Sequence, residues 1–311
     1  MGKESIDPNH SGGDPEHPGG DGPDRPKPIS AVWDHRQSAL LVLGMGFILT
    51  VFIGLRIFSL VGIERPPTWF FWSLGGSAAF ATVVWRLRAA TPGAAVLGGF
   101  LSFSLLTRQY FDVSWSKTAL PELALLFVLT FAATRFGRRR KLALGLTDRR
   151  ERRGRQASQV MANLGVAGYL GIAGDTALFA GALAVLAEAT ADTVSSELGQ
   201  VFGGRTILIT TGKIVPPGTD GAISLAGTAC GVLSAGLIAA LAAWLEAVPP
   251  RLAVVVFVSG TAGLLFDSLL GATLERWGWL GNDWVNFAST AFSGFLAMKI
   301  AAFFQPSIPF W

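Results

Sequence analysis

Residues 252–274 read LAVVVFVSGTAGLLFDSLLGATL, and Asp267 is the one charged side chain among them. A helix that crosses a bilayer needs about 20 apolar residues in succession, because the hydrocarbon core is about 30 Å thick. An apolar run of this length is typical of a membrane span. The stretch therefore predicts a transmembrane helix that carries one carboxylate.

Apolar blocks of this kind recur along the chain. Half of the 311 residues are hydrophobic and 15% are charged, whereas a soluble domain carries about 25% charge. We therefore predict an all-α, polytopic transmembrane helix bundle of about nine helices, with a small β-hairpin in a cytoplasmic loop. The other eight blocks are residues 38–60, 69–85, 94–106, 120–134, 160–173, 177–191, 223–247 and 285–304.

The fifth and sixth blocks are short for membrane spans. One interpretation is that they recruit flanking polar residues, such as Gln159 and Asn163, and cross as short helices buried among their neighbours. The other is a re-entrant hairpin that turns at Gly174-Asp175. The first interpretation is favoured, because short helices surrounded by protein are tolerated in membranes.

Five segments follow from composition. Residues 1–37 are rich in Pro, Gly, Asp and His, which predicts a disordered N-terminal tail. Residues 38–134 hold four transmembrane helices, 135–158 a basic loop, 159–304 a C-terminal transmembrane domain and 305–311 a C-terminal tail. No signal peptide is expected, because no short apolar core follows a basic start.

The basic loop predicts the orientation. Residues 135–158 contain ten Arg and Lys side chains but only two acidic ones, Asp148 and Glu151. The positive-inside rule places this loop in the cytoplasm, and counting spans places the N-terminus there too. We expect a multi-pass protein of the cell (plasma) membrane. Because orientation explains the arginines, we expect no nucleic-acid partner.

Two residue types are excluded from chemistry within the membrane. All three histidines precede the first apolar block, at His10, His17 and His35. Cys230 is the only cysteine, so no disulfide can form within the chain. A site among the helices is therefore expected to use carboxylates, amides, hydroxyls and cations.

The first candidate cluster spans residues 188–199. In a continuous helix Glu188, Asp192 and Ser196 share a face, while Glu197 lies about 140° from Asp192. Carboxylates and hydroxyls at the rim of an apolar helix suit Mg²⁺, which prefers oxygen ligands. The alternative is a solvated helix end with a capping residue.

The second candidate is the loop before the seventh block. The β-branched runs on both sides of Gly212-Lys213 predict a hairpin. Glycines before a helix N-terminus let backbone N–H groups approach an anion. We therefore predict phosphate binding here, the alternative being a structured turn. The predicted phosphate-binding residues are Arg205, Lys213, Gly218, Thr219 and Gly221.

Further polar groups lie at matching depths. Asp267 is a carboxylate inside an apolar helix, where a charge costs roughly 2.5–3.5 kcal/mol to insert, which favours function or metal binding. The alternatives are a packing hydrogen bond or a carboxyl kept neutral by burial. Asn163 and Asn286 open the fifth and ninth blocks, and each alone is more typical of helix–helix hydrogen bonding. Four helices thus place polar groups toward the cytoplasmic side, which predicts one shared site.

These same segments resemble a known family. The strings Ser158–Asn163, Ala191–Gly199, Ile209–Gly212, Val215–Thr219, Asp267–Ala272 and Val285–Phe287 are similar to the membrane family catalogued as domain of unknown function 92. That family includes transmembrane protein 19 and the plant phytyl-phosphate kinase of tocopherol synthesis. The resemblance covers residues 155–304, and the first four helices match in hydrophobic character alone. It implies a helical membrane protein, and one branch phosphorylates an isoprenoid monophosphate.

We therefore predict a prenyl-phosphate kinase that transfers phosphate from a nucleoside triphosphate to an isoprenoid monophosphate of the membrane. Phosphoryl transfer depends on positioned charge, so the missing histidines are no obstacle. Asp192, Glu197 and Asp267 would be the catalytic residues and would hold Mg²⁺. Asn163 and Asn286 would bind phosphate or ribose oxygens.

Two alternatives stay open at this point. A transporter or channel would place ion sites near the midplane, whereas these polar groups lie toward one face. A non-catalytic membrane protein would tolerate substitution of Asp192 or Asp267.

Overall fold

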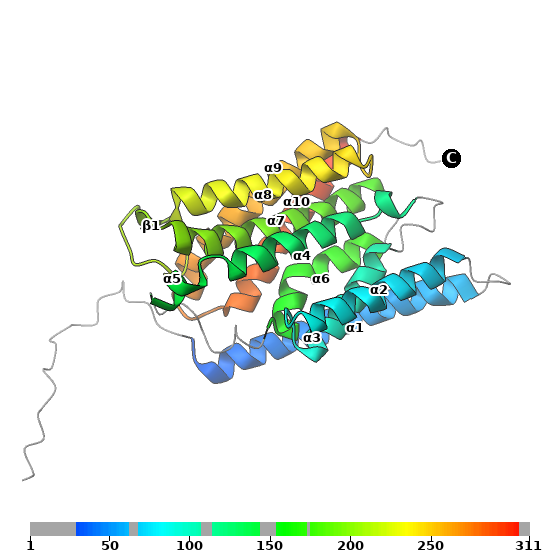
Figure 1. Cartoon of the computed structure of the whole chain (residues 1–311), viewed down its shortest axis with the longest axis horizontal. Coiled ribbons are helices and arrows are strands. Elements are labelled where there is room, and N and C mark those ends of the chain that lie inside the picture. The colour runs from blue at the N-terminus through cyan, green and yellow to red at the C-terminus, as the bar shows by residue number, and fades with distance from the viewer. Residues whose placement is uncertain (1–28, 62–67, 107–113, 144–153, 173–174, 305–311) are drawn as a thin grey trace, which may run out of the picture.

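The computed structural model describes residues 29–61, 68–106, 114–143, 154–172 and 175–304. The described residues form ten α-helices, a 3₁₀ turn (η2), a π-helical turn (η4) and a two-stranded sheet (Figure 1). In chain order these are α1 (Ala31–Val61), α2 (Thr68–Arg86), α3 (Pro92–Leu106), η2 (Trp115–Lys117), α4 (Leu120–Arg135), α5 (Arg138–Ala143), α6 (Ala157–Ile172), α7 (Thr176–Phe202), β1 (Thr206–Leu208), β2 (Ala222–Ser224), α8 (Leu225–Trp244), α9 (Pro250–Leu270), η4 (Gly271–Glu275) and α10 (Asn282–Phe303).

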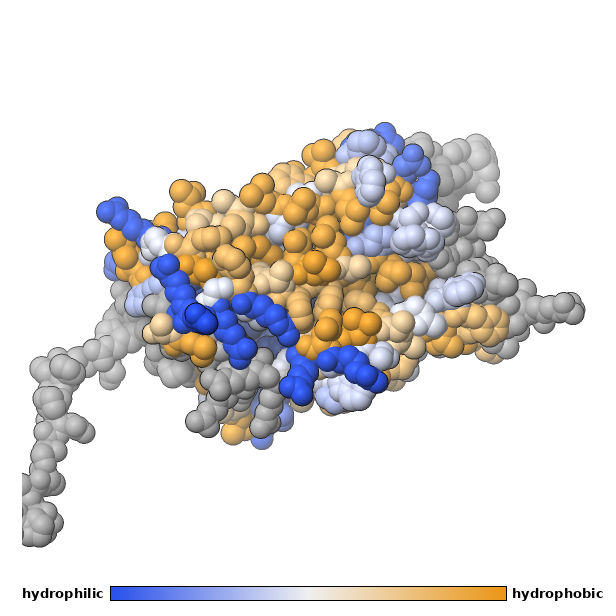
Figure 2. Space-filling model, in the orientation of Figure 1, coloured by the Kyte–Doolittle hydropathy of each residue, from blue (hydrophilic) through white to orange (hydrophobic). Residues whose placement is uncertain are grey.

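The predicted all-α transmembrane class is confirmed. Among the described helices five are long and apolar enough to cross a membrane, namely α1, α7, α8, α10 and α9 together with η4. Figure 2 shows mostly hydrophobic residues between two groups of hydrophilic side chains at opposite ends of the bundle. The chain is an integral, multi-pass membrane protein. Nine of the ten α-helices match the nine apolar blocks, and α5 is an additional short helix in the basic segment.

Helix α7 is the centre of the bundle. It packs against α4, α6, α8, α9 and α10, and most of its residues from Ala177 to Val194 are buried. Glycine lets these neighbours approach closely: a Cβ on Gly181 would lie 2.9 Å from the carbonyl oxygen of Gly294 on α10. With 27 residues, α7 is long enough to cross, which favours a full span over the re-entrant alternative. Residues 173–174 of that proposed turn lie outside the described residues.

Helices α1, α2 and α3 lie on one side of the bundle, where α1 and α3 pack on α6 and α1 also contacts α10 (Figure 1). Helix α1 begins at Ala31, so the expected tail boundary at residue 37 is wrong for its last seven residues. The reason is tertiary: Gln37 Nε2 donates to the carbonyl of Trp279 at 2.8 Å, and Gln37 Oε1 accepts from Gly281 N at 2.8 Å. These bonds fasten the start of α1 to the turn before α10.

The predicted hairpin is present and is part of a larger one. Leu208 N donates to the carbonyl of Lys213 at 2.9 Å, which closes the turn at Gly212. The named strands pair beyond it, with Thr206 opposite Ser224 in the antiparallel sheet. Residues 209–221 therefore form a long excursion between the end of α7 and the start of α8.

Candidate functional site

A cavity of about 1470 Å³ opens where α4, α7 and α9 end and where α6 and α10 begin. Its wall includes Asn163 of α6, Asp192 of α7, Asp267 of α9 and Asn286 of α10. The four helices thus bring their polar groups to one cavity, as the depth of these residues along their helices predicted.

The side chains of Asp192 and Asp267 approach each other on the cavity wall. Ser289 Oγ of α10 also donates to Asp267 Oδ1 at 3.1 Å. Glu188 lies one helical turn before Asp192 and is 1% exposed. One of its oxygens, Oε2, has no hydrogen-bond partner among the described residues. Oxygen-bearing groups from α7, α9 and α10 thus form a continuous patch.

Glycines allow this convergence. On α9, a Cβ at Gly260 would lie 2.8 Å from the Cβ of Ala187, and one at Gly263 would lie 2.9 Å from the Cβ of Ser293. Ser293 Oγ in turn donates to the carbonyl of Ala184 at 3.0 Å. Because α9 and α10 sit this close to α7, short Asp and Ser side chains suffice to bridge them.

Asp192 and Asp267 are the cavity residues that could hold Mg²⁺ together with a phosphate ligand. Within the described part of the chain, no group of three or more His, Cys, Asp or Glu side chains could hold a metal ion. Mg²⁺ at kinase-type sites is commonly bound by one or two carboxylates plus substrate phosphates and water. Asp192 and Asp267 provide that pair. Two carboxyl groups this close also repel unless a proton or a cation lies between them.

Glu197, the third expected metal ligand, has a different partner. Its carboxylate is ion-paired with Lys141 of α5, whose Nζ also donates to the carbonyl of Ala133 at 3.0 Å. The Lys141 side chain is only 6% exposed and that of Glu197 only 17%. The structure therefore groups Asp192 with Asp267 and joins Glu197 to the basic helix, although all three line the cavity.

Arg155 is held in the cavity by its backbone. Arg155 N donates to the carbonyl of Ala89 at 2.9 Å and Thr91 N donates to the carbonyl of Arg155 at 3.0 Å, a parallel bridge to the turn between α2 and α3. Gly154 permits this contact: its φ is +83°, and a Cβ there would lie 2.8 Å from Ala90 N. Arg155 Nη2 then donates to Thr193 Oγ1 at 3.1 Å, which places the guanidinium beside Asp192.

The glycine-rich loop forms another part of the wall. Gly218, Thr219, Asp220 and Gly221 all line the cavity. Gly221 has a φ of +69°, and a Cβ there would overlap the backbone of Ala272, so only glycine lets the loop rest on η4. Thr219 N and Ala222 N donate within the loop and the N-terminus of α8 is capped by Ser224, so several of its N–H groups are already used.

Asp220 adds a carboxyl to this rim, outside the spans. Burial raises the pKa of Asp220, and the positive charge of Arg276 partly opposes that rise. Asn282 and Glu275, at the end of η4, also line the cavity. The rim is therefore polar and acidic on the side of α9 and basic on the side of α5.

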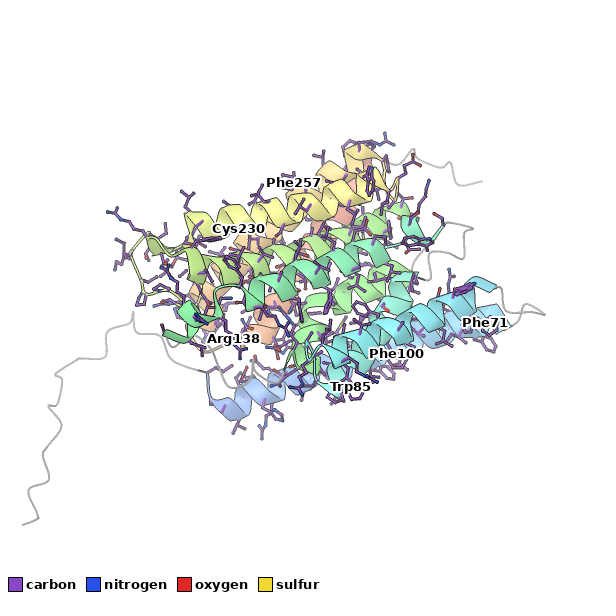
Figure 3. All side chains as sticks on the ribbon, viewed as in Figure 1. Phe71, Trp85, Phe100, Arg138, Cys230 and Phe257 are labelled. Atoms are coloured by element: carbon purple, nitrogen blue, oxygen red, sulfur yellow. The ribbon has the colours of Figure 1, made fainter. Side chains whose placement is uncertain are left out.

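The cations of the cavity differ from those that the sequence suggested. Arg205 and Lys213 are exposed and do not line the cavity, so the structure does not bring them to Asp192 and Asp267. The charge pattern of the basic segment indicated orientation alone, although the segment lies between α4 and α6, which both line the cavity. Figure 3 shows Arg138 of that segment at the end of the bundle where α5 follows α4. The Arg and Lys side chains that line the cavity are Arg88, Arg135, Arg138, Lys141 and Arg155.

One histidine also reaches the cavity. His35 lies on α1 and is part of the cavity wall. His35 precedes the first apolar block, as the sequence shows, but the helix that contains this block begins before it. Gln37 fastens this earlier start of α1 to the turn before α10. His35 is exposed, so it stands at the rim of the cavity.

The family model for Integral membrane protein DUF92 matches residues 75–294, a range that includes Asn163, Asp192, Asp267 and Asn286. This chain belongs to that family. The predicted resemblance is confirmed, and it extends upstream of residue 155 into α2, α3 and α4. No solved structure matches the chain.

Three curated relatives are similar to the chain. Protein VTE6, chloroplastic, of Arabidopsis thaliana is 35% identical over 189 residues, 57% of this chain and 56% of the relative. Uncharacterized membrane protein MJ0933 of Methanocaldococcus jannaschii is 42% identical over 120 residues, 39% of this chain and 50% of the relative. Uncharacterized membrane protein sll0875 of Synechocystis is 29% identical over 245 residues, 70% of this chain and 95% of the relative. The match thus spans about half the length of the first two relatives.

Proposed function

We propose that this protein is a kinase that transfers a phosphoryl group from a nucleoside triphosphate to an isoprenoid monophosphate at the cytoplasmic side of the membrane. The observation that carries the proposal is the meeting of Asp192 and Asp267 beside Arg155 in one cavity. The family's plant phytyl-phosphate kinase branch, together with the likeness to the plant relative, supports the isoprenoid substrate.

The mixed charge of the cavity favours a metal-bound polyphosphate. Free phosphate would be repelled by the carboxylates, and a bare cation would be repelled by the arginines. A nucleoside triphosphate with Mg²⁺ offers phosphate oxygens to the arginines and a cation to the carboxylates. When bound, Mg²⁺ would neutralise charge on the transferred and leaving phosphates, with Asp192 and Asp267 as its protein ligands. Binding of Mg²⁺ at Asp192 and Asp267 is therefore proposed together with the activity.

The reaction needs positioning more than covalent chemistry. A terminal oxygen of the lipid monophosphate attacks the γ-phosphorus, and the bond from that phosphorus to the bridging oxygen of the β-phosphate breaks. The nucleoside diphosphate leaves with the bond electrons, and the lipid becomes a diphosphate. A phosphate dianion needs no general base, so the step requires no histidine.

The cationic residues would hold the phosphates in line. Arg155 is positioned by its bridge to the α2–α3 turn and by Thr193. Arg guanidinium groups bind phosphate oxygens through two parallel hydrogen bonds, which fixes geometry as well as charge. Asn163 and Asn286, on α6 and α10, would contact phosphate or ribose oxygens. The basic end of the bundle would face the cytoplasm, where nucleotide is available.

The test uses the purified full-length protein in lipid nanodiscs. It is supplied with phytyl or geranylgeranyl monophosphate, Mg²⁺ and each common nucleoside triphosphate, and the lipid diphosphate is measured by mass spectrometry. We expect diphosphate from at least one pair, and its loss in Arg155→Met. Absence of diphosphate from every pair, with a folded protein, would overturn the proposal.

A further inference from the structure

Part of the cavity wall is apolar, and the proposed phosphate chemistry does not use it. Besides the polar groups, the wall includes the apolar side chains of Phe80, Val84, Leu126, Phe127, Phe131 and Leu164, which together we name the apolar arm. These residues come from α2, α4 and α6. The arm is continuous with the polar end, because both belong to one cavity.

Helix α4 shows that the polarity of the cavity wall changes along the apolar arm. The α4 residues that line the cavity are Leu123, Leu126, Phe127, Thr130, Phe131, Thr134 and Arg135. Their spacing of three and four places them on one helical face. That face begins with leucine and phenylalanine and ends with threonine and arginine. From Leu123 to Arg135 it extends roughly 18 Å, at about 1.5 Å per residue.

Aromatic contacts connect the arm to the charged end. The rings of Phe80 on α2 and Phe127 on α4 meet edge to face with centroids 5.9 Å apart, and the rings of Phe127 and Phe131 are 5.4 Å apart. The Arg135 guanidinium carbon lies 3.5 Å from the centroid of Phe131. Arg135 Nη2 also donates to the carbonyl of Leu87 at 3.2 Å, so a cation stands at the mouth of the arm.

Helices α2 and α4 meet through few residues, among them Phe80 and Phe127. Helix α2 packs on α3, while α4 packs mainly on α7. Protein interiors are normally close-packed, and side chains around an apolar void lose contacts on one side. Apolar walls also disfavour polar ligands, which would lose hydrogen bonds to water. The geometry fits an apolar chain whose charged head rests at Arg135 and Arg155.

We propose that the apolar arm binds the isoprenoid chain of the lipid phosphate, between α2, α4 and α6, with the phosphate at the basic end. This inference rests on the proposed function and adds to it the site of the lipid chain. It also gives the N-terminal helices a role: α2 supplies one wall of the substrate site. Acyl chains with a phosphate head, such as lysophosphatidate, share the general chemistry but are not the occupant proposed.

Photolabelling tests the arm without requiring catalysis. The full-length protein in nanodiscs is given geranylgeranyl monophosphate that carries a diazirine at the far end of its chain, and labelled peptides are mapped by mass spectrometry. We expect labels on the α2 and α4 peptides that contain Phe80 and Leu126, and competition by unlabelled geranylgeranyl monophosphate but not by lysophosphatidate. Labels confined to the outer faces of α8 and α9, or equal competition by lysophosphatidate, would overturn the proposal.

A pair of variants on one helix sharpens the test. Leu126→Trp fills the arm and should lower labelling at least tenfold, whereas Val128→Trp is the matched control, because Val128 is 58% exposed and does not line the cavity. Equal labelling of both folded variants would contradict the proposal. If Leu126→Trp does not fold, the label map of the unaltered protein decides. Labelling in the arm without diphosphate formation would separate failure of the kinase proposal from failure of this one.

Discussion

The two ends of the bundle each hold an ion pair, and the pairs differ in their surroundings. At the cavity end Lys141 and Glu197 have side chains 6% and 17% exposed. At the opposite end Lys117 and Glu246 are 2.8 Å apart with side chains 41% and 77% exposed. Charges removed from water need partners and fixed geometry, whereas exposed charges are screened. The cavity end therefore holds positioned, partly desolvated charge, which a phosphoryl-transfer site requires.

The largest effect is expected from Asp267→Asn. This change keeps the size of the side chain but removes the negative charge at the meeting point with Asp192. Diphosphate formation should fall roughly 10²- to 10³-fold, the range seen when one preorganised electrostatic group of an active site is lost. The assay is the mass-spectrometric one, and Glu246→Gln at the opposite end is the control. Full activity in Asp267→Asn would show that a carboxylate at the cavity end matters no more for diphosphate formation than one at the opposite end.

A double-mutant cycle measures the coupling free energy between Lys141 and Glu197. Lys141→Met leaves the Glu197 carboxylate without its partner and should destabilise the protein by about 1–3 kcal/mol, less than for a fully buried pair because Glu197 is partly exposed. Adding Glu197→Gln should recover much of that loss. Thermal unfolding in detergent provides the readout. Strictly additive effects of the two changes would argue against a coupled pair.

Helix packing beneath the cavity can be tested by comparing two glycines of α8. Gly231 on α8 has no room for a side chain, since a Cβ would lie 2.8 Å from the carbonyl oxygen of Ala191 on α7. We expect Gly231→Ala to destabilise by about 1–3 kcal/mol through overpacking. Gly236→Ala, farther along α8, is the control, because its nearest neighbour is a Phe257 ring carbon at 3.6 Å. Similar melting temperatures for the two variants would contradict this account.

The smallest effect is expected from Glu246→Gln. The hydrogen bond from Lys117, together with its positive charge, lowers the pKa of Glu246. A carboxyl whose pKa is lowered by folding contributes stability above its ordinary pKa of about 4.3, and that contribution is lost as the pH falls through the lower folded value. The variant should therefore have a slightly lower melting temperature than the unaltered protein at neutral pH and low salt. The difference should vanish in acid, and a difference that grew on acidification would have the wrong sign.

Much of the fold follows from local sequence. A long apolar block predicts a helix, because lipid requires every backbone polar group to be satisfied within the helix. The position of Asp267 within its apolar block, and of Asp192 directly after its block, likewise indicated their depth along the helices. The boundary of α1 could not be predicted in this way, since residues 31–37 are helical through the bonds of Gln37 to the turn at Trp279 and Gly281.

The local sequence did not predict which cationic side chains line the cavity. Arg205 and Lys213 stand beside a glycine-rich turn and carry the expected charge, but both are exposed and neither lines the cavity. Arg155 reaches it because its backbone pairs with Ala90 in the α2–α3 turn, far earlier in the chain. The amino-acid sequence thus determined which helices form and how deep their polar groups lie. Tertiary packing decided which charges share the site, because side-chain direction depends on contacts between segments far apart in the chain.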